Sequence, residues 1–397
     1  MKVAFFLSSL AGGGVERSTL YLAGALVRAG HAVELVVCKP KGELRDQIPS
    51  GVGLVELPRE GVLLARLRPL RSDPAGAAAL LLPVLLPFSA SNKLRFLSGL
   101  AEYLRRTRPD VLISAMTWPN LVALWARRAA GVRTRVVVSE RNSFSSYVAH
   151  FSQRWRWRFL PGLVGRVYPW ADAIVSVADA VGDDLAETTG LARARIRTLY
   201  NPVIGADLEA RAAADPGHPW LGDPALPVVL AAGRLRANKD FATLLRAFAR
   251  ARRVRPLRLV ILGDGEQREA LHALAQELGV AEHVALPGWV ENPLAWMSRA
   301  SLFVLSSAWE GLPGVLIQAL ACGCPVVSTD APGGASEILA GGALGPLVRV
   351  GDDEALAAAM LSVLEKPPDA ATARAAADRF RVENSVRAWS SLLEELE

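Results

Sequence analysis

Two loops in the second half of the sequence carry the side chains best suited to chemistry. The first holds Arg234 and Lys239 between an apolar run and a helical pattern, with no acidic residue until Asp240. The second places Glu310 among Gly and Pro residues, directly before another helical pattern. Cations beside the backbone amides at the start of a helix bind phosphate groups, so the first loop predicts a diphosphate site. A solvated basic loop is the alternative interpretation.

The elements that position these loops are predicted by apolar runs of strand length that alternate with helical patterns. This alternation indicates βαβ units with parallel sheets, so we expect an α/β fold of two doubly wound domains. The pattern restarts after a loose, proline-interrupted stretch, residues 193–227. The expected strands are residues 3–8, 32–38, 111–115, 134–139 and 173–177 in the first half, and 228–232, 257–262, 283–286, 301–305 and 325–328 in the second.

Further loops follow the carboxyl ends of these strands, where open parallel sheets bind their ligands. Three glycines, 12–14, stand before a helix and leave its amides open to an anion, although a tight turn explains them equally well. Their spacing is not the G-x-G-x-x-G of dinucleotide-binding oxidoreductases, which argues against that class. Gly263, Gly265, Gly288 and Val290 also follow strands and can bring backbone close to a flat base, or can form ordinary turns.

Gln318 is a polar residue in the otherwise apolar helix expected to begin near Gly314. A buried amide needs a hydrogen-bond partner. We therefore expect Gln318 to bond either to neighbouring backbone or to a polar ligand that it shares with Glu310.

Composition excludes several classes. The chain has 397 residues, 51% hydrophobic, with 33 Gly and 25 Pro, which is typical of a globular protein and not of a disordered or coiled-coil one. Three cysteines cannot form a disulfide framework and favour a reducing compartment. The most apolar segment, residues 77–88, is too short to cross a bilayer, and no zinc-finger or RNP-type spacing indicates a nucleic-acid partner.

The positive charge is unevenly distributed. The chain has a formal net charge of +6, and residues 59–108 contain nine basic and three acidic residues. Trp157 lies among arginines and off the apolar stripe formed by Phe151, Trp155, Phe159 and Leu163, a composition typical of an interfacial helix. These features favour an anionic membrane surface as a partner.

The motifs together resemble the retaining, GT-B-fold glycosyltransferases of family 4, the group 1 transferases. The resemblance covers nearly the whole chain and is strongest over residues 228–339. Its marks are Gly-Gly-x-Glu at 13–16, Gly-Arg-Leu-x-x-x-Lys at 233–239, Gly-Asp-Gly at 263–265, the element that starts at Glu310, and the loop at 332–339.

The resemblance implies a GT-B architecture of two Rossmann-like domains that face a cleft. We expect residues 1–200 to bind the acceptor, residues 201–378 to bind a nucleotide-sugar, and a last helix, 379–397, to cross back to the first domain. The implied reaction is sugar transfer from a nucleotide diphosphate sugar, with UDP as the expected carrier, with retention and without metal or cofactor.

The resemblance also assigns roles. Arg234 and Lys239 are expected to hold the diphosphate and Glu310 the donor sugar, and these are the expected catalytic residues. Position 318 would face the ribose. The implied donor-binding residues are Gly13, Gly14, Gly263, Gly265, Gly288, Val290, Leu312, Pro313, Gly314 and Gln318.

The sequence departs from the family at two places. The second Glu of the family element is Gln318, which can still bond to ribose but carries no charge. Many relatives place a His after the fourth strand of the first domain, where this chain reads Ser-Ala-Met-Thr-Trp at 114–118. The acceptor-side candidates are instead the polar residues of the loop expected after residue 139, namely Glu140, Arg141, Asn142 and His150.

The expected acceptor is a lipid-linked sugar, a lipopolysaccharide core or another glycan. The expected location is the cytoplasm, on the inner face of the cytoplasmic membrane. Two alternatives remain open: a nucleotide-sugar-binding protein that has lost catalysis, which the residue at 318 motivates, and a nucleotide-sugar epimerase of the same fold.

Overall fold

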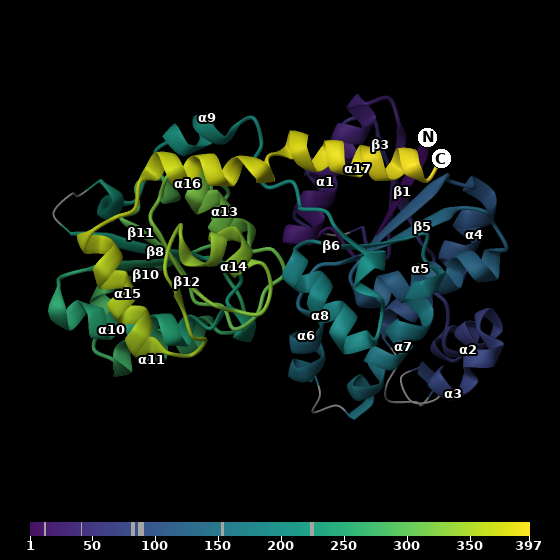
Figure 1. Ribbon diagram of the computed structural model, residues 1–397, viewed down its shortest axis with the longest axis horizontal. Coiled ribbons are helices and arrows are strands. Elements are labelled where there is room, and N and C mark those ends of the chain that lie inside the picture. Colours follow the sequence, from purple (N-terminus) through teal and green to yellow (C-terminus); the bar gives the residue numbers. More distant parts are fainter. Residues whose placement is uncertain (12, 41, 81–83, 86–90, 152–154, 223–225) are drawn as a thin grey trace. The chain divides into compact units, whose positions relative to one another are not determined.

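The computed structural model describes residues 1–11, 13–40, 42–80, 84–85, 91–151, 155–222 and 226–397. The chain forms two compact units, each built on its own parallel sheet (Figure 1). The first unit comprises Met1–Pro202 and Glu383–Glu397, and the second comprises Val203–Val382.

The first sheet has the strand order β3-β2-β1-β4-β5-β6-β7, and every pairing is parallel. Its strands are β1 Lys2–Leu7, β2 Ala32–Val37, β3 Val52–Glu56, β4 Val111–Ala115, β5 Arg135–Glu140, β6 Ala173–Ser176 and β7 Ile196–Thr198. The expected strands are all present. The sequence analysis missed β3, whose residues are only partly buried, and β7, which lies inside the stretch interpreted as loose.

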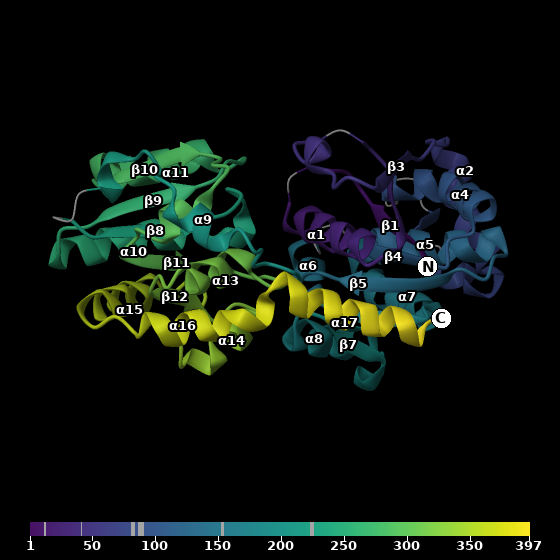
Figure 2. The same ribbon diagram turned by 90° about the horizontal axis from the view of Figure 1, so that it is seen from above.

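The two faces of this sheet are covered by different helices, because successive residues of a strand point to opposite sides. Val3 and Phe5 of β1 pack with α1 and with Trp389 of α17, whereas Ala4 and Phe6 pack with α4, α5 and α7. Figure 1 shows α1 and α17 on one side of this sheet and α5 and α7 on the other, and Figure 2 looks onto the side of α1 and α17. The helices of the unit are α1 Gly14–Arg28, α2 Val62–Ser72, α3 Ala77–Leu80, α4 Leu97–Thr107, α5 Thr117–Ala130, α6 Phe144–Phe151, α7 Leu160–Val167, α8 Asp179–Thr189 and α17 Val382–Glu395.

The C-terminal helix α17 completes the core of the first unit. Trp389 is 1% exposed and belongs to the same apolar cluster as β1, β2 and α1. Near the end of the helix, Glu395 forms an ion pair of 2.6 Å with Arg197 of β7. The first unit therefore draws its core from two segments that are far apart in the sequence.

The second sheet has the order β10-β9-β8-β11-β12-β13, again with parallel pairings. Its strands are β8 Val228–Ala232, β9 Arg258–Leu262, β10 Val284–Gly288, β11 Leu302–Leu305, β12 Val326–Thr329 and β13 Leu347–Val348. The helices of this unit are α9 Leu208–Ala213, α10 Phe241–Val254, α11 Arg268–Glu277, α12 Pro293–Met297, α13 Gly314–Ala321, α14 Ala335–Ile338, α15 Asp353–Glu365 and α16 Ala370–Ala377.

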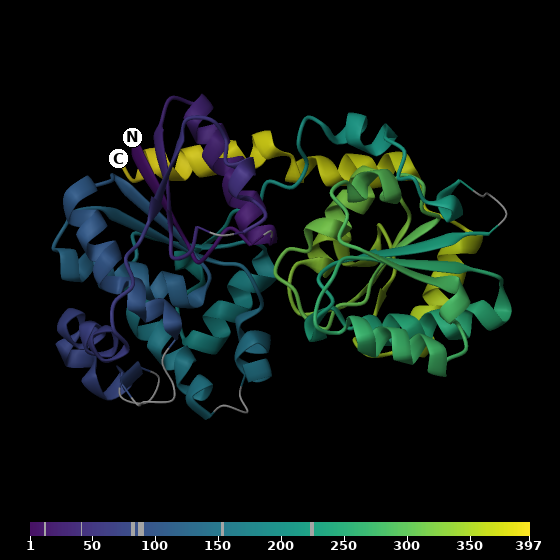
Figure 3. The ribbon, with the colours of Figure 1, turned by 180° about the vertical axis from the view of Figure 1, so that it is seen from behind.

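Helices α10, α11 and α15 cover one face of the second sheet, and α12 and α13 cover the other (Figure 3). Asp240 caps α10, as expected, by accepting a hydrogen bond from the amide of Thr243 at 3.3 Å. Helix α13 begins at Gly314, also as expected. The two sheets with their covering helices confirm the predicted Rossmann-like α/β fold.

The interpretation of residues 151–163 as one helix with an interfacial Trp157 is wrong. Helix α6 ends at Phe151, residues 155–159 form a 3-10 helix, and α7 starts at Leu160, while residues 152–154 lie outside the described part. Trp157 packs against the core and stacks on Phe151 at 4.9 Å, whereas Phe159 is 41% exposed. Because residues 155–159 are not α-helical, residues four positions apart in this segment do not share the face that an α-helix would give them.

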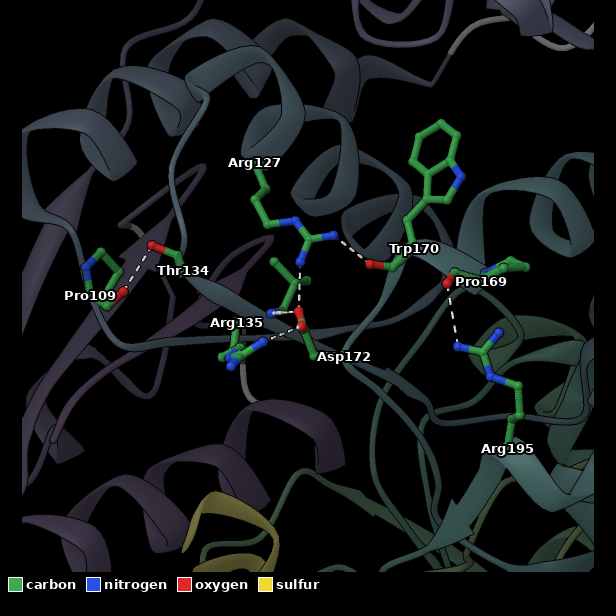
Figure 4. Close-up of polar contacts among 9 residues, drawn as sticks. Pro109, Arg127, Thr134, Arg135, Pro169, Trp170, Asp172 and Arg195 are labelled. Atoms are coloured by element: carbon green, nitrogen blue, oxygen red, sulfur yellow. Dashed lines mark hydrogen bonds and ion pairs between the residues drawn. The ribbon is translucent and has the colours of Figure 1, made fainter. Parts of the chain in front are cut away.

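Asp172, just before β6, connects α5 and β5 at the amino edge of the first sheet (Figure 4). Its carboxylate accepts from the guanidinium of Arg127 at 2.6 Å and from the amide of Val136 at 2.8 Å, and it pairs with Arg135 at 3.4 Å. A hollow of about 790 Å³ at this edge is lined partly by Arg105, Arg108, Arg133 and Arg135, and it contains none of the predicted site residues. The chemistry expected from the sequence belongs to the opposite, carboxyl edges of the sheets.

Candidate functional site

Strands β8 and β11 are neighbours in the second sheet although their numbers are not consecutive, so the chain reverses its winding between them. Ligands of doubly wound sheets bind at such switch points, outside the carboxyl ends of the strands. The loops that follow these two strands are bonded to each other. The amide of Ala308 donates to the carbonyl of Asn238 at 2.8 Å, and the hydroxyl of Ser306 donates to the carbonyl of Lys239 at 2.8 Å.

Lys239 and Glu310, one from each loop, form an ion pair. The ammonium of Lys239 lies 2.5 Å from Oε1 of Glu310, and the hydroxyl of Ser307 donates to the same oxygen at 2.6 Å. The other oxygen, Oε2, accepts no hydrogen bond within the described part of the chain. An ammonium has three donors, so the pair presents a fixed cation with unused donors beside a free carboxylate oxygen.

The loop after β12 holds Glu310 from the other side. The amide of Glu310 donates to the carbonyl of Pro332 at 2.9 Å, and the amide of Gly334 donates to the carbonyl of Gly311 at 2.6 Å. Gly333 has φ +126°, and a Cβ there would lie 2.4 Å from the carbonyl oxygen of Glu310. Only glycine fits this position, and the approach of the two backbones depends on it.

The glycines after β9 serve the same purpose around Arg234. A Cβ on Gly263, which has φ +125°, would lie 2.0 Å from the carbonyl oxygen of Gly233, and one on Gly265 would lie 2.5 Å from that of Leu235. The amide of Gly263 donates to the carbonyl of Gly288 at 2.7 Å, which links the loop after β9 to the end of β10. These glycines let three loops pack into one backbone surface, and direct contact with a base stays a prediction.

The start of α13 is open to a ligand. Its N-cap residue is Pro313, and no side chain caps the first turn. Leu312 and Gly314 are half-buried on either side of it. Of the two partners expected for Gln318, neighbouring backbone is not used: the residue is half-buried, and its amide side chain makes no hydrogen bond to another described residue. A bond to a polar ligand stays a prediction. The amide is accessible because the helix is less deeply buried at this position than its apolar neighbours suggested.

Arg234 is exposed on the same loop as Lys239, five positions earlier. Its neighbour Arg236 forms an ion pair with Glu266 at 3.6 Å, so part of the basic loop is a solvated surface loop, which was the alternative interpretation.

After β10, Val290 is half-buried and Trp289 is 53% exposed. Trp289 and Ser307 were not among the site residues expected from the sequence. Their signals were an aromatic side chain next to Gly288 and a hydroxyl three positions before Glu310.

In the first unit, the glycine-rich turn after β1 leads into α1 with Gly13 as the N-cap residue and without a side-chain cap. Gly14 is exposed, and nothing lies within 4 Å of where its Cβ would be. The first turn of α1 is therefore an uncapped, accessible helix start. This geometry suits an anion, as expected, but it does not identify one.

Glu140 ends β5 with its carboxylate in the protein interior. It accepts hydrogen bonds from the hydroxyl of Tyr168, from Thr117 at 3.1 Å and from Asn120 at 3.4 Å, and the residue is 3% exposed. Burial raises the pKa of Glu140 to about 7, against the opposing effect of these hydrogen bonds. Glu140 therefore lies in β5 and not in the loop expected after residue 139, and its contact with an acceptor stays a prediction.

The other acceptor candidates differ in their surroundings. Arg141 is buried and donates to the side chain of Asn201, and burial lowers the pKa of Arg141 to about 10. Asn142 is half-buried and lies near the sulfur of Met116 at 3.9 Å. His150 was expected in a loop, but it lies on α6 and is exposed there, because the helix starts earlier than the sequence indicated.

No group of three or more His, Cys, Asp or Glu side chains in the described part of the chain is placed to hold a metal ion. No helix among the same residues combines the length and apolar character needed to span a membrane.

Family models match both units. The model of glycosyl transferases group 1 matches residues 222–380, and the model of glycosyltransferase family 4 matches residues 12–204. The chain belongs to the group 1 glycosyltransferases. Its fold is GT-B, because solved members of that fold superimpose over the whole length: the Anabaena protein Alr3699/HepE in complex with UDP-glucose has a TM-score of 0.77 and 21% identity and covers 100% of both chains.

Two relatives of this group 1 chain are named for the synthesis of lipid-linked or lipopolysaccharide sugars. The N-acetylgalactosamine-N,N'-diacetylbacillosaminyl-diphospho-undecaprenol 4-alpha-N-acetylgalactosaminyltransferase of Campylobacter jejuni is 34% identical over 62% of this chain and 65% of the relative. The lipopolysaccharide core biosynthesis glycosyltransferase LpsE of Rhizobium meliloti is 38% identical over 35% of this chain and 39% of the relative. The chain thus matches less than two thirds of the length of either relative.

Proposed function

We propose that this chain transfers a sugar from a nucleotide diphosphate sugar to a lipid-linked or lipopolysaccharide acceptor. The observation that carries the proposal is the Lys239–Glu310 pair at the β8–β11 switch point, next to the uncapped start of α13. UDP is the proposed carrier. The complex of HepE with UDP-glucose supports that choice, and the names of the curated relatives support the acceptor class.

Each site residue has a role in this proposal. Lys239 and Arg234 supply positive charge to the diphosphate, and the free Oε2 of Glu310 accepts a hydroxyl of the donor sugar. The backbone amides of Leu312 and Gly314, which flank Pro313, contact phosphate oxygens. Gln318 bonds to the ribose, and the backbone at Gly288 and Val290 supports the base.

Charge separation explains why this arrangement promotes transfer. As the bond between the anomeric carbon and the phosphate oxygen breaks, negative charge grows on the diphosphate and positive charge grows on the sugar ring. A fixed ammonium and helix amides stabilise that leaving group more in the transition state than in the ground state. Ser307 and the loop after β12 hold Glu310, so little reorganisation is needed during the reaction.

Retention follows if the acceptor attacks the face from which the diphosphate leaves. In this proposal the acceptor hydroxyl forms the new bond to the anomeric carbon and passes its proton to the phosphate oxygen that has just been released. No enzyme nucleophile and no metal takes part. The acceptor lies on the first unit near Arg141 and Asn142, and the enzyme works at the inner face of an anionic membrane.

Transfer of radiolabelled sugar tests the proposal. The full chain is incubated with a panel of nucleotide-sugars and with undecaprenyl-diphosphate oligosaccharide or lipopolysaccharide core, and the anomeric configuration of the product is determined by NMR. A labelled lipid product with the donor's configuration supports the proposal, whereas an inverted product refutes retention. Nucleotide binding without product indicates the binding protein, and a converted nucleotide-sugar without added acceptor indicates the epimerase.

A further inference from the structure

Helix α2 exposes a cluster of large apolar side chains. Among the described residues, four of the eight large hydrophobic side chains that are exposed belong to this helix. They are Val62, Leu63, Leu64 and Leu67, with exposed fractions of 42%, 78%, 58% and 53%, and we refer to them as the α2 patch. Single exposed leucines are common in soluble proteins, but a contiguous apolar cluster marks a surface that contacts something else.

The α2 patch is part of a firmly packed helix. The opposite side of α2, formed by Ala65, Pro69 and Ser72, is buried, and the hydroxyl of Ser72 donates to the carbonyl of Trp125 in α5 at 3.1 Å. Directly after the helix, Asp73 accepts two hydrogen bonds of 2.7 Å from Arg166 in α7. The leucines are therefore held outward by a fixed helix.

Spacing places the outward residues on one face. Leu63 and Leu67 are four positions apart, as are Leu67 and Arg71, and Leu64 is one turn from Leu67. Such pairs are neighbours on a helix surface. Arg71 is exposed as well, so a cation lies at the end of the apolar face.

The charges around the patch are positive. Residues 59–73 contain Arg59, Arg66, Arg68 and Arg71 and two acids, Glu60 and Asp73, which gives a net charge of +2. Both acids are already engaged within the protein: Glu60 accepts from Ser98 at 2.7 Å and lies 3.5 Å from Arg68, and Asp73 pairs with Arg166. A surface that approaches α2 thus meets apolar side chains bordered by arginines.

The patch lies at the functional edge of its sheet. Helix α2 follows β3, and its first turn comes five residues after that strand ends, whereas the start of α1 and residues Arg141 and Asn142 follow β1 and β5. Since these strands are parallel, their carboxyl ends lie at the same edge. Figure 1 shows α2 at the rim of the first unit, beside α4 and α5.

We infer that the α2 patch is the surface by which the protein docks on an anionic lipid bilayer. The leucines enter the boundary between headgroups and acyl chains, and the neighbouring arginines contact the anionic headgroups, as in an interfacial helix. This inference rests on the proposed function, because it gives a lipid-linked acceptor a place of entry at the edge where the acceptor residues lie. Charge complementarity favours the bilayer over an apolar protein partner.

The test is co-sedimentation of the full chain with vesicles made of equal parts phosphatidylglycerol and phosphatidylcholine, or of phosphatidylcholine alone. The test variants are Leu63→Gln/Leu64→Gln/Leu67→Gln and Arg59→Gln/Arg71→Gln. The control is Val254→Gln, which removes a side chain that is 75% exposed on α10 of the second unit. Unchanged thermal unfolding and UDP binding establish that each variant is folded.

We expect the wild type and the control to bind the anionic vesicles. The triple leucine variant should bind them at least about tenfold more weakly, because each leucine loses its transfer out of water. The double arginine variant should lose the preference for phosphatidylglycerol. The inference would be overturned if the leucine variant bound the vesicles as strongly as the wild type, or if the wild type bound neither kind of vesicle.

Two further readouts separate this inference from its rivals and from the proposed function. If light scattering shows that the wild type is a dimer and the leucine variant a monomer, the patch binds a second copy and the inference is wrong. Transfer to a short, water-soluble acceptor analogue should be equal in the wild type and the leucine variant, whereas transfer to the lipid acceptor in vesicles should fall at least about tenfold. Absence of transfer to any acceptor would refute the proposed function and leave the vesicle result standing.

Discussion

The ammonium of Lys239 and the carboxylate of Glu310 lie 2.5 Å apart although 71 positions separate them in the sequence. Each residue lies in the loop that follows one of two adjacent strands, so the order of the strands in the sheet brings them together. The side chains are 17% and 9% exposed, which makes the pair much less screened than a surface ion pair. The pair connects the stability of the second unit to its proposed chemistry.

Lys239→Met should affect both properties. Removal of the ammonium leaves Glu310 nearly buried without its cation, so the free energy of unfolding should fall by roughly 2 kcal/mol. Turnover should fall by roughly 10²–10³, as for the loss of one donor to a developing charge. Urea unfolding and radiolabelled sugar transfer measure the two effects.

The control for that prediction is Lys239→Met/Glu310→Gln, which removes both charges. Its stability should return toward that of the wild type while turnover stays low, because only the transition state still needs the cation. Normal turnover in the single variant would contradict the role proposed for Lys239.

Gly333→Ala should disrupt the loop that holds Glu310. Gly333 and Gly279 both have positive φ, at +126° and +67°, but only at Gly333 would a Cβ meet backbone, 2.4 Å from a carbonyl oxygen. Gly279→Ala therefore measures the backbone strain alone. Gly333→Ala should lower the free energy of unfolding by about 2 kcal/mol more and raise KM for the donor. Equal effects of the two substitutions in thermal unfolding would show that the loop relaxes freely.

Position 318 offers a test of the ribose contact. Gln318→Glu should strengthen UDP binding about tenfold, because a carboxylate accepts hydroxyl hydrogen bonds more strongly than an amide does. Gln318→Ala should weaken it. Gln276→Glu, on the exposed side of α11, adds the same charge away from the site and should change nothing. The measurement is isothermal titration calorimetry, and unaltered affinity in the alanine variant would remove Gln318 from the site.

Glu140 should make the first unit less stable as the pH rises. Its pKa is about 7 in the folded chain against an ordinary 4.5, so between these values the folded state keeps a proton that the unfolded state has lost. The stabilising contribution is therefore complete below pH 4.5 and is lost as the pH passes through 7, a difference of about 3 kcal/mol.

Glu140→Gln removes that titration. The free energy of unfolding of the wild type, relative to this variant, should decline with pH over the same interval in urea titrations. Glu102→Gln, at an exposed glutamate of the same unit, controls for the loss of one carboxyl group outside the interior. A difference between wild type and Glu140→Gln that is constant with pH would show that the carboxyl is ionised in the fold.

The sequence predicted the central strands and the loops at their carboxyl ends because both depend on local patterns. Apolar runs such as Val228–Ala232 identify strands that are covered on both faces, and the glycines at 263 and 333 stand where backbones approach closely. The edge strands β3 and β13 were not predicted because both are only partly buried, and β13 is two residues long, too short for an apolar run to identify it.

Side-chain environments were less predictable because they depend on distant residues. Nothing local to Glu140 indicates that Tyr168 and Thr117 enclose its carboxylate. Trp157 has arginines as sequence neighbours, but its spatial neighbours are Phe151, Tyr147 and the core. Neighbours along the chain describe a helix face only within one α-helix, whereas here α6 is described to Phe151 and residues 155–159 form a 3-10 helix.

The C-terminal helix has a consequence for synthesis on the ribosome. Domains usually fold in the order in which they emerge, the N-terminal one first. Here the second unit is continuous in the sequence, whereas the first needs Trp389 to close its apolar cluster. The first unit, although it is translated before the second, thus matures after it, and until α17 emerges from the ribosome it exposes a hydrophobic surface on which a nascent-chain chaperone can act.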